Sequence, residues 1–193
     1  AYISELNRQT TPEDSDVNSH KLTYTYNQTG NITDIGYPLT ASDEVTGIHY
    51  TYNPNGRITT VSAKMGAQIK PIREYTYNGF GEISDITQHD NFTGAGDQTI
   101  KTTYSYDDMG RVVAMTASDK DENVVEHFAY SYDSKSNIAT EMDGNTTKSY
   151  TYDDLGRLTK VDSTTGQTTS STAYVYDNAG NRTQKTTGTT ETA

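Results

Sequence analysis

The sequence contains no cysteine and no tryptophan, and it has only three phenylalanines and no long apolar run. The lack of cysteine excludes disulfides, thiolate metal sites and cysteine nucleophiles. A membrane-spanning helix needs about 18 or more consecutive apolar residues, so no such helix is expected. The first ten residues also lack the basic start and apolar stretch of a signal peptide.

Positive charge is scarce as well. Fifteen Lys and Arg residues stand against 26 Asp and Glu residues, which gives a formal net charge of -11 at pH 7 and a pI near 4.6. Binding to nucleic acid requires a basic surface that replaces the counterions of the phosphates. Anionic lipid headgroups select for basic segments in the same way. Neither nucleic acid nor a membrane is therefore an expected partner.

Apolar residues make up only 31% of the chain, and the mean hydropathy is -0.83. Such values are typical of disordered segments, but those segments are also poor in aromatics. This chain has sixteen tyrosines. A tyrosine buries an apolar ring while its hydroxyl stays hydrogen-bonded or hydrated. We therefore predict a folded chain with a thin, tyrosine-rich core.

The tyrosines are arranged in tandem repeats, which dominate the sequence. Seven Tyr-x-Tyr pairs account for fourteen of the sixteen, and successive pairs begin 20 to 29 residues apart. The copies are YTYNQTGN at Tyr24, YTYNPNGR at Tyr50, YTYNGFGE at Tyr75, YSYDDMGR at Tyr104, YSYDSKSN at Tyr130, YTYDDLGR at Tyr150 and YVYDNAGN at Tyr174.

Each copy reads as one half of a β-hairpin. Tyrosines at i and i+2 lie on the same face of a strand. The Asp or Asn that follows, with Gly three positions later, indicates a type I turn closed by a left-handed glycine. The predicted structural positions are Tyr24, Tyr26, Gly30, Tyr50, Tyr52, Gly56, Tyr75, Tyr77, Gly81, Tyr104, Tyr106, Gly110, Tyr130, Tyr132, Tyr150, Tyr152, Gly156, Tyr174, Tyr176 and Gly180.

A return strand follows each glycine, as in RITTV from Arg57. If the turn Asp or Asn pairs with the residue after Gly, Ile58 lies opposite Tyr52 and Val112 opposite Tyr106. The apolar residues of this strand often stand three apart, a spacing that a flat strand would place on opposite faces. Either a β-bulge or partial cover of both faces explains it. The pairs are Ile32/Ile35, Ile58/Val61 and Ile83/Ile86.

Polar segments rich in Gly, Ser, Thr and Asp separate the hairpins and are predicted to be loops along the edge opposite the turns. The expected organisation is an irregular lead-in or partial repeat over 1–21, seven hairpins over 22–187 and a truncated tail over 188–193. The predicted loops are Leu39–Gly47, Ser62–Pro71, Asp90–Gln98, Ser118–Asn123, Asp143–Asn145 and Ser163–Ser171, of which Asp143-Gly144-Asn145 has the composition of a tight turn.

Two copies depart from the pattern. Ser136 replaces the turn glycine of the fifth copy, which predicts an altered turn geometry. Arg182 takes the apolar position of the last return strand, which predicts a fraying terminus.

The best copies, Asp143–Val161 and Tyr104–Met115, resemble the RHS or YD repeat, whose pattern is Y-x-Y-D-x-x-G-R-L after a Gly-containing turn. The resemblance covers Leu22 to about Lys185, and three copies carry the full Gly-Arg: Gly56-Arg57, Gly110-Arg111 and Gly156-Arg157. Such repeats occur in bacterial polymorphic toxins, in the B and C components of Tc toxins, in wall-associated proteins and in teneurins.

The resemblance implies an all-β fold, in which tandem hairpins form a curved or spiralling antiparallel sheet. It further implies a non-enzymatic scaffold, part of a shell or stalk in a large secreted or cell-surface bacterial protein. The implied partners are the flanking repeats of the parent and an enclosed toxin cargo or a surface carbohydrate. No cofactor is expected.

Three other functions compete with the scaffold. Catalysis has little support, because the histidines (His20, His49, His89 and His127) share no repeat position. A calcium site is a weak candidate at Asp119, Asp121 and Asn123, which alternate as in a calcium loop but lack its Gly and terminal Glu. Carbohydrate binding is the strongest alternative, because tyrosine rings or loops can stack on sugars. Mostly buried rings would contradict that stacking.

An open array also has exposed edge strands at both ends, which can pair with further copies of the chain.

Overall fold

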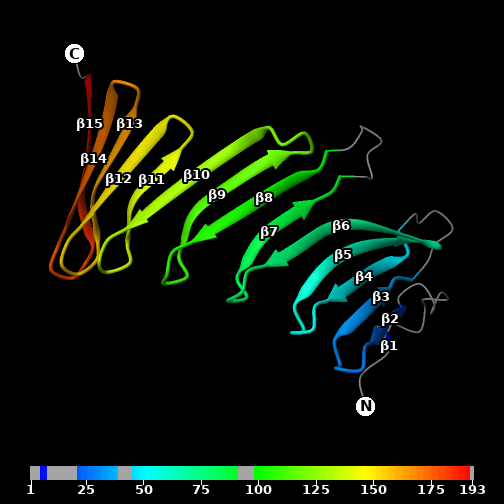
Figure 1. Cartoon of the computed structure of the whole chain (residues 1–193). Helices are drawn as coiled ribbons and strands as arrows, with labels where there is room; N and C mark the ends of the chain where they lie inside the picture. The colour runs from blue at the N-terminus through cyan, green and yellow to red at the C-terminus, as the bar shows by residue number, and fades with distance from the viewer. Residues whose placement is uncertain (1–4, 8–20, 39–44, 91–97, 192–193) are drawn as a thin grey trace, which may run out of the picture. The chain divides into compact units, whose positions relative to one another are not determined.

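The computed structural model describes residues 5–7, 21–38, 45–90 and 98–191. Fifteen antiparallel strands follow one another in chain order within a sheet, so each strand neighbours the next one in sequence (Figure 1). The all-β hairpin fold is therefore confirmed. The strands are β1 (Glu5–Asn7), β2 (Lys21–Tyr26), β3 (Ile32–Gly36), β4 (Gly47–Tyr52), β5 (Ile58–Met65), β6 (Gln68–Tyr77), β7 (Ile83–Gln88), β8 (Ile100–Tyr106), β9 (Val112–Asp119), β10 (Val124–Tyr132), β11 (Ile138–Asp143), β12 (Thr146–Tyr152), β13 (Leu158–Thr165), β14 (Thr168–Tyr176) and β15 (Arg182–Glu191).

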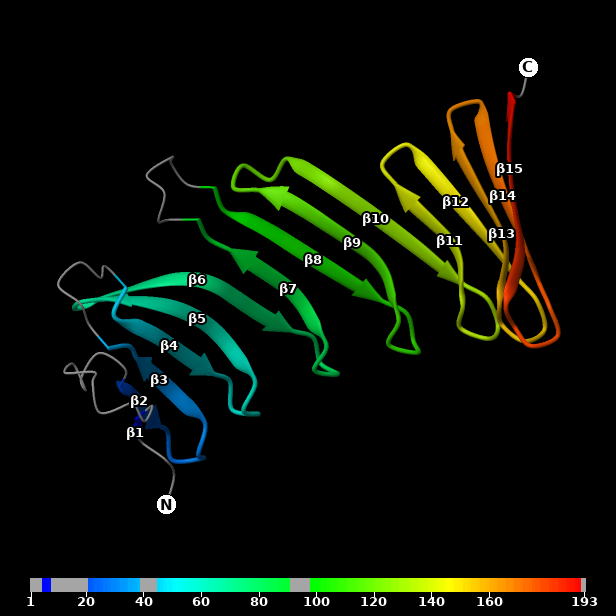
Figure 2. The ribbon, with the colours of Figure 1, turned by 180° about the vertical axis from the view of Figure 1, so that it is seen from behind.

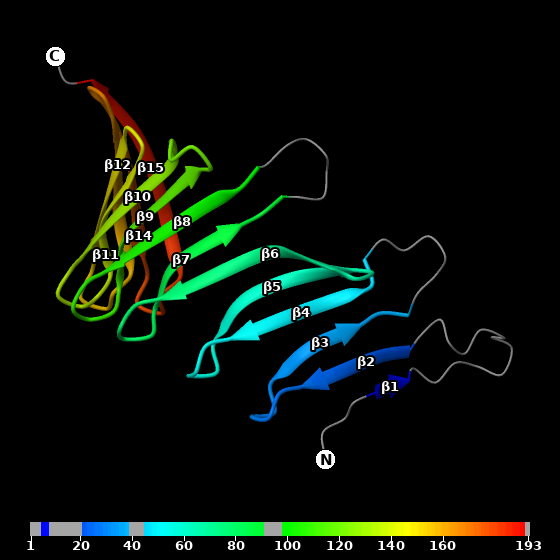
Figure 3. The ribbon, with the colours of Figure 1, turned by 45° about the vertical axis from the view of Figure 1, so that its right-hand side comes forward.

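The chain divides into two compact units, which we describe separately. Unit 1 comprises residues 1–101 and contains three complete hairpins, β2–β3, β4–β5 and β6–β7. The turns of these hairpins all lie at the same end of the strands (Figure 3). Unit 2 comprises residues 102–193 and contains the hairpins β10–β11, β12–β13 and β14–β15 together with the turn between β8 and β9 (Figure 2).

A β-bulge explains the spacing of the apolar residues in the return strands. In the first hairpin Thr25 pairs with Asp34 but Tyr26 pairs with Ile32, so Thr33 is the extra residue. Ile35 pairs with Tyr24, and both isoleucines consequently face the same side as the tyrosines. The same shift occurs in the second hairpin, where the predicted pairing of Ile58 with Tyr52 is confirmed. It recurs in the third, fifth, sixth and seventh hairpins.

The two faces of the strands carry different chemistry. One face carries the tyrosines and their apolar partners. The other carries the residue between each Tyr pair, which is exposed in all seven copies. Hydroxyl pairs line this second face, including Thr51 with Thr59 at 2.8 Å and Ser131 with Thr140 at 2.6 Å. Such cross-strand hydroxyl pairs stabilise a sheet modestly.

The core is correspondingly thin. Among the described residues the buried apolar side chains are Ala63 and Ala117, and no large side chain is fully buried. All fourteen motif tyrosines are half-buried. Each hairpin is therefore held mainly by its ladder of backbone hydrogen bonds and by contacts to neighbouring hairpins, as in other repeat proteins.

Two predicted loops are wrong. Ser62–Pro71 and Ser163–Ser171 are mostly strand, and only Gly66-Ala67 and Gly166-Gln167 form the connecting turns. Thr and Ser runs are polar but suit a sheet with a solvated face, where their hydroxyls pair across strands. In β6, Pro71 is accommodated at a register shift, where a ladder amide is not needed.

The other connections vary. The tight turn predicted at Asp143-Gly144-Asn145 is confirmed, with Gly144 at φ 53° between paired residues Asp143 and Thr146. Residues 39–44 and 91–97, which make up most of two predicted loops, lie outside the described residues. Within the predicted lead-in, Glu5–Asn7 form β1, which pairs with β2.

The expected fraying of the last strand is wrong. β15 pairs with β14 from Arg182 to Glu191, into the segment that the sequence assigned to a tail. The guanidinium carbon of Arg182 lies 5.7 Å from the ring centroid of Tyr174. An arginine can occupy this position because its stem and planar head pack on a tyrosine as an apolar residue would.

Candidate functional site

The seven hairpin turns share one hydrogen-bonding pattern. The amide of the first turn residue donates to the carbonyl four residues later, and the fourth amide donates back, as in Asp107 with Arg111 and Gly110 at 2.9 Å each. The side-chain oxygen of the same first residue accepts from two further amides at 2.8 to 3.1 Å in all seven copies. This satisfaction of turn amides explains why Asp or Asn stands there.

Ser136 adopts the glycine conformation, so the predicted change in turn geometry is wrong. Its φ is 67°, and its amide donates to the carbonyl of Asp133 at 3.0 Å as the turn glycines do. The left-handed region costs a non-glycine residue about 1–2 kcal/mol. The fifth turn therefore keeps its shape at a cost in conformational energy.

The second tyrosine of five motifs fastens its hairpin to the preceding one. The hydroxyl of Tyr52 donates to the carbonyl of Ile32 at 2.5 Å, and that of Tyr77 to the carbonyl of Ile58 at 2.7 Å. In unit 2 the hydroxyls of Tyr132, Tyr152 and Tyr176 donate to the first residue of the preceding return strand at 2.6, 2.9 and 2.8 Å. We call this contact the tyrosine clamp.

The arginine after the turn glycine also reaches the next hairpin. The guanidinium carbons of Arg57, Arg111 and Arg157 lie 5.6, 4.4 and 4.8 Å from the ring centroids of the clamp tyrosines Tyr77, Tyr132 and Tyr176. Such distances are within cation–π range. Arg111 and Arg157 also pair with their own turn carboxylates, Asp107 and Asp153, at 2.7 Å.

Hydrogen bonding controls the electrostatics of the turn carboxylates. The side chain of Arg111 is the main cause that lowers the pKa of Asp107, and the Asn137 and Asn181 side chains do the same for Asp133 and Asp177. The backbone amide of Arg157 is the main cause for Asp153. Burial raises the pKa of the clamp hydroxyls of Tyr52, Tyr77 and Tyr152, which remain protonated donors at neutral pH.

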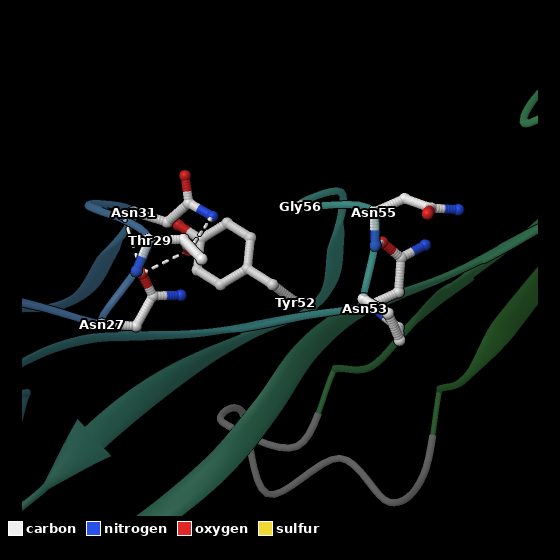
Figure 4. A pocket seen from close by; sticks show the side chains of 8 residues that line it. Asn27, Thr29, Asn31, Tyr52, Asn53, Asn55 and Gly56 are labelled. Carbon is white, nitrogen blue, oxygen red and sulfur yellow. Dashed lines mark hydrogen bonds between the residues drawn. The ribbon is translucent and has the colours of Figure 1, made fainter.

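A groove lies between the first two turns in unit 1 (Figure 4). Its volume is about 380 Å³, and the Tyr52 ring stands between the two turns. The lining side chains are uncharged amides, a hydroxyl and two rings: Asn27, Thr29, Asn31, Tyr52, Asn53, Pro54 and Asn55, with Gly56. At the contacts between the second and third, fourth and fifth, and sixth and seventh turns, by comparison, an arginine covers the tyrosine ring.

Unit 1 also carries a charged cluster on the hydroxyl face. Asp34 accepts from Lys64 Nζ at 2.9 Å and lies 3.0 Å from His49 Nδ1 and 2.8 Å from Thr25 Oγ1. Burial opposes ionisation of Asp34, but these hydrogen bonds outweigh it and hold its pKa far below the usual range. A fixed carboxylate between Lys64 and His49 is a structural ion pair that ties β3, β4 and β5 together.

The calcium candidate forms another turn of the same kind. Asp119 Oδ1 accepts from the amides of Asp121 and Asn123 at 2.9 Å each, and Glu122 takes the left-handed position with φ 65°. Asn123 Nδ2 also donates to Asp119 at 3.0 Å. These contacts occupy the Asp119 oxygens within the protein and favour a structural turn over a calcium site.

The described histidines do not come together in the structure. No group of three or more His, Asp or Glu side chains there is arranged to hold a metal ion. His49 and His89 lie in unit 1 and His127 in unit 2, each against different partners, while His20 is outside the described residues. Across the same described ranges, no helix has the length and apolar character that a membrane crossing requires.

The predicted structural residues come together as hairpins, but the contacts between hairpins were missed. The Gly-Arg pairs were visible in the sequence, whereas the ring that each arginine covers belongs to the following repeat. The tyrosine clamp was missed for the same reason. The sequence does carry a signal for both: Arg recurs in every second copy, and the second Tyr, which recurs in all seven, lies near the same turn end of the neighbouring hairpin.

The comparisons with known proteins agree on the fold. The family model described as Teneurin YD-shell matches residues 97–192. The Photorhabdus luminescens Tc holotoxin pore is similar in structure, with 16% identity, a TM-score of 0.67 and coverage of 88% of this chain and 9% of that one. The crystal structure of TcdB2-TccC3 matches at 17% identity and a TM-score of 0.67, covering 94% of this chain and 11% of that one. No curated protein matches the sequence.

This chain thus spans about a tenth of the length of the toxin chains that it matches.

Proposed function

The chain is an RHS/YD-repeat protein, and on that premise we propose that it is a wall segment of a β-hairpin shell in a larger secreted or surface-exposed bacterial protein. Its role in this proposal is mechanical: it extends the sheet by seven hairpins and joins the repeats that flank it. An enclosed cargo, such as a toxin segment, belongs to the same proposal.

The tyrosine clamp is the observation that carries the proposal. In both units the most distinctive side chain of the repeat uses its hydroxyl to bind the backbone of the preceding hairpin. A ligand-binding tyrosine ladder would instead leave its hydroxyls free and its rings exposed. These rings are half-buried beside the apolar residues of the return strands. Such use of the repeat residues favours a scaffold over a carbohydrate-stacking or catalytic surface.

Hydrogen exchange tests the proposal through the outermost strand. Among the described residues β15 pairs only with β14, so half of its backbone groups point away from the sheet. If this chain is a wall segment, those outward amides are bonded by the next hairpin in the native polypeptide. We expect them to exchange slowly there and rapidly in the 193-residue chain alone. Rapid exchange in both would contradict a continuous wall.

A further inference from the structure

The first hairpin of unit 1 lacks the arginine that follows the turn glycine in the second, fourth and sixth hairpins. Arg57, Arg111 and Arg157 each follow the turn glycine and cover the clamp tyrosine of the next hairpin. In the first hairpin the same position is Asn31, and the clamp tyrosine that follows is Tyr52. The face of Tyr52 is thus the place where a guanidinium would stand.

Asn31 is too short to fill that place. Its amide nitrogen folds back to Thr29 Oγ1 at 3.2 Å, within its own turn. A Cβ built at Gly56 would meet this amide nitrogen at an ordinary contact distance of 3.6 Å, whereas one built at Gly81 would overlap the Arg57 guanidinium. The result of the shorter side chain is the groove of about 380 Å³ between the first two turns (Figure 4). The groove is therefore the gap left by a missing arginine.

The acceptor that Arg157 uses in the next turn has an equivalent in the groove. Arg157 Nη1 donates to the carbonyl of Asp177, the first residue of the next turn, at 3.3 Å. The equivalent carbonyl in the groove belongs to Asn53. At the contact between the fifth and sixth turns, Lys135 Nζ uses the carbonyl of Asp154 in a similar way, at 3.1 Å. In unit 2, cationic side chains thus bind backbone carbonyls of the neighbouring turn at two places.

We propose that the groove between the first two turns is a binding site for an arginine side chain presented by a partner polypeptide. The guanidinium would stack on Tyr52 and donate to the Asn53 carbonyl, as Arg157 does within the chain. The groove lining carries no positive charge, and the chain has a net charge of -11, so a cation is favoured over an anion. A planar fork of donors suits the ring and carbonyl better than a compact ammonium. This site goes beyond the scaffold role.

Proton–nitrogen NMR of the 193-residue chain tests the site with ethylguanidinium chloride as the probe. We expect saturable shifts of the Asn31 and Asn55 side-chain amides and of the Gly56 backbone amide. Ethylammonium chloride at the same concentration and ionic strength should produce much smaller shifts, and methyl glucoside none. Absence of saturable shifts, equal shifts with ethylammonium, or shifts with methyl glucoside alone would overturn the proposal; the last result would identify a sugar site instead.

Two variants provide matched controls. Asn31→Arg fills the groove from within, so the guanidinium-dependent shifts should disappear while the rest of the spectrum stays unchanged. Arg57→Ala opens the equivalent position over Tyr77, so ethylguanidinium should then also shift Gly81, which it should not shift in the parent chain. Persistence of the Gly56 shift in Asn31→Arg, or no new shift at Gly81 in a folded Arg57→Ala variant, would contradict the assignment.

Discussion

Units 1 and 2 build the same turn with different chemistry. The turns of unit 1 begin with Asn27, Asn53 and Asn78, whereas those of unit 2 begin with Asp107, Asp133, Asp153 and Asp177. Amide and carboxylate oxygens accept the same two backbone amides at indistinguishable distances. The turn geometry thus depends on an oxygen at this position and not on its charge.

The charge matters for the arginine that follows. In unit 2, Arg111 and Arg157 bind their turn carboxylates, and their guanidinium carbons lie 4.4 and 4.8 Å from the next tyrosine ring. In unit 1, Arg57 follows a turn that begins with Asn53, and the corresponding distance is 5.6 Å. A carboxylate that orients the guanidinium therefore accompanies closer stacking.

The largest expected effect is common to both units. Tyr77→Ala in unit 1 and Tyr132→Ala in unit 2 each remove a half-buried ring and a clamp hydrogen bond. We expect each to lower the free energy of unfolding by about 2–3 kcal/mol. Urea unfolding followed by circular dichroism measures both. A loss in one unit more than twice that in the other would break the equivalence of the clamps.

Alanine substitutions at the turn glycines should lower the free energy of unfolding by different amounts in the two units. Gly81 and Gly156 have φ of 86° and 75°, so alanine at either is expected to cost about 1–2 kcal/mol. A Cβ at Gly156 meets nothing within 4 Å, but one at Gly81 displaces the Arg57 guanidinium. Gly81→Ala should therefore cost about 0.5–1 kcal/mol more, through lost stacking on Tyr77. Equal unfolding free energies for the two variants would contradict the position of Arg57.

Acid should weaken the turns of unit 2 before those of unit 1. The folded pKa values of Asp107, Asp133, Asp153 and Asp177 are lowered. Their contribution to stability is complete above the unfolded pKa of about 3.9 and is lost as the pH falls through the folded values. The asparagine turns do not titrate. Amide exchange at the turns, measured from pH 5 to pH 2, should show earlier loss of protection in unit 2.

Replacing the four turn aspartates of unit 2 with asparagine provides the control for the acid effect. The turn geometry should persist, and the loss of protection in the unit 2 turns should move to lower pH. An unchanged acid response would show that other groups, such as Glu141 or Asp162, control it; their pKa values are also lowered by hydrogen bonds, chiefly from lysines.

The smallest expected effect is a gain in stability. Glu122 holds a left-handed conformation, with φ 65°, in the turn that begins at Asp119. Glu122→Gly should remove that strain and raise the free energy of unfolding by about 0.5–1 kcal/mol. The gain is smaller than the strain itself because glycine has more conformational freedom in the unfolded chain. A thermal melt detects the change. A decrease would show that the Glu122 side chain has a role of its own.

Much of the fold followed from residue pattern because the decisive contacts are local. Tyr, Asp or Asn, and Gly lie within seven residues of one another in each copy, and together they specify a strand and its turn. The three-residue spacing of Ile32 and Ile35 fits either a β-bulge or partial cover of both faces, so the spacing alone does not choose between them. Only the pairing of Tyr24 with Ile35 and Tyr26 with Ile32 decides between them.

What the sequence did not reveal depends on contacts between repeats or on conformational tolerance. The polar runs near Ser62 and Ser163 predict loops, because hydroxyl pairing across strands leaves no apolar alternation in the sequence. Ser136 lacks the freedom of glycine, yet the side-chain bonds of Asp133 to the backbone hold its turn in the usual shape. The groove beside Tyr52 arises from Asn31 in another hairpin, so no local pattern marks it.

The central claim is that, within both units, the second tyrosine of the motif clamps neighbouring hairpins through its hydroxyl. The most direct measurement compares Tyr→Phe variants at the two motif positions, with Tyr77 against Tyr75 in unit 1 and Tyr132 against Tyr130 in unit 2. Within the described residues the first-position hydroxyls of these pairs donate no hydrogen bond. We expect Tyr77→Phe and Tyr132→Phe to lower the free energy of unfolding by about 1 kcal/mol each, and Tyr75→Phe and Tyr130→Phe to leave it nearly unchanged. Equal effects at both positions would contradict the clamp.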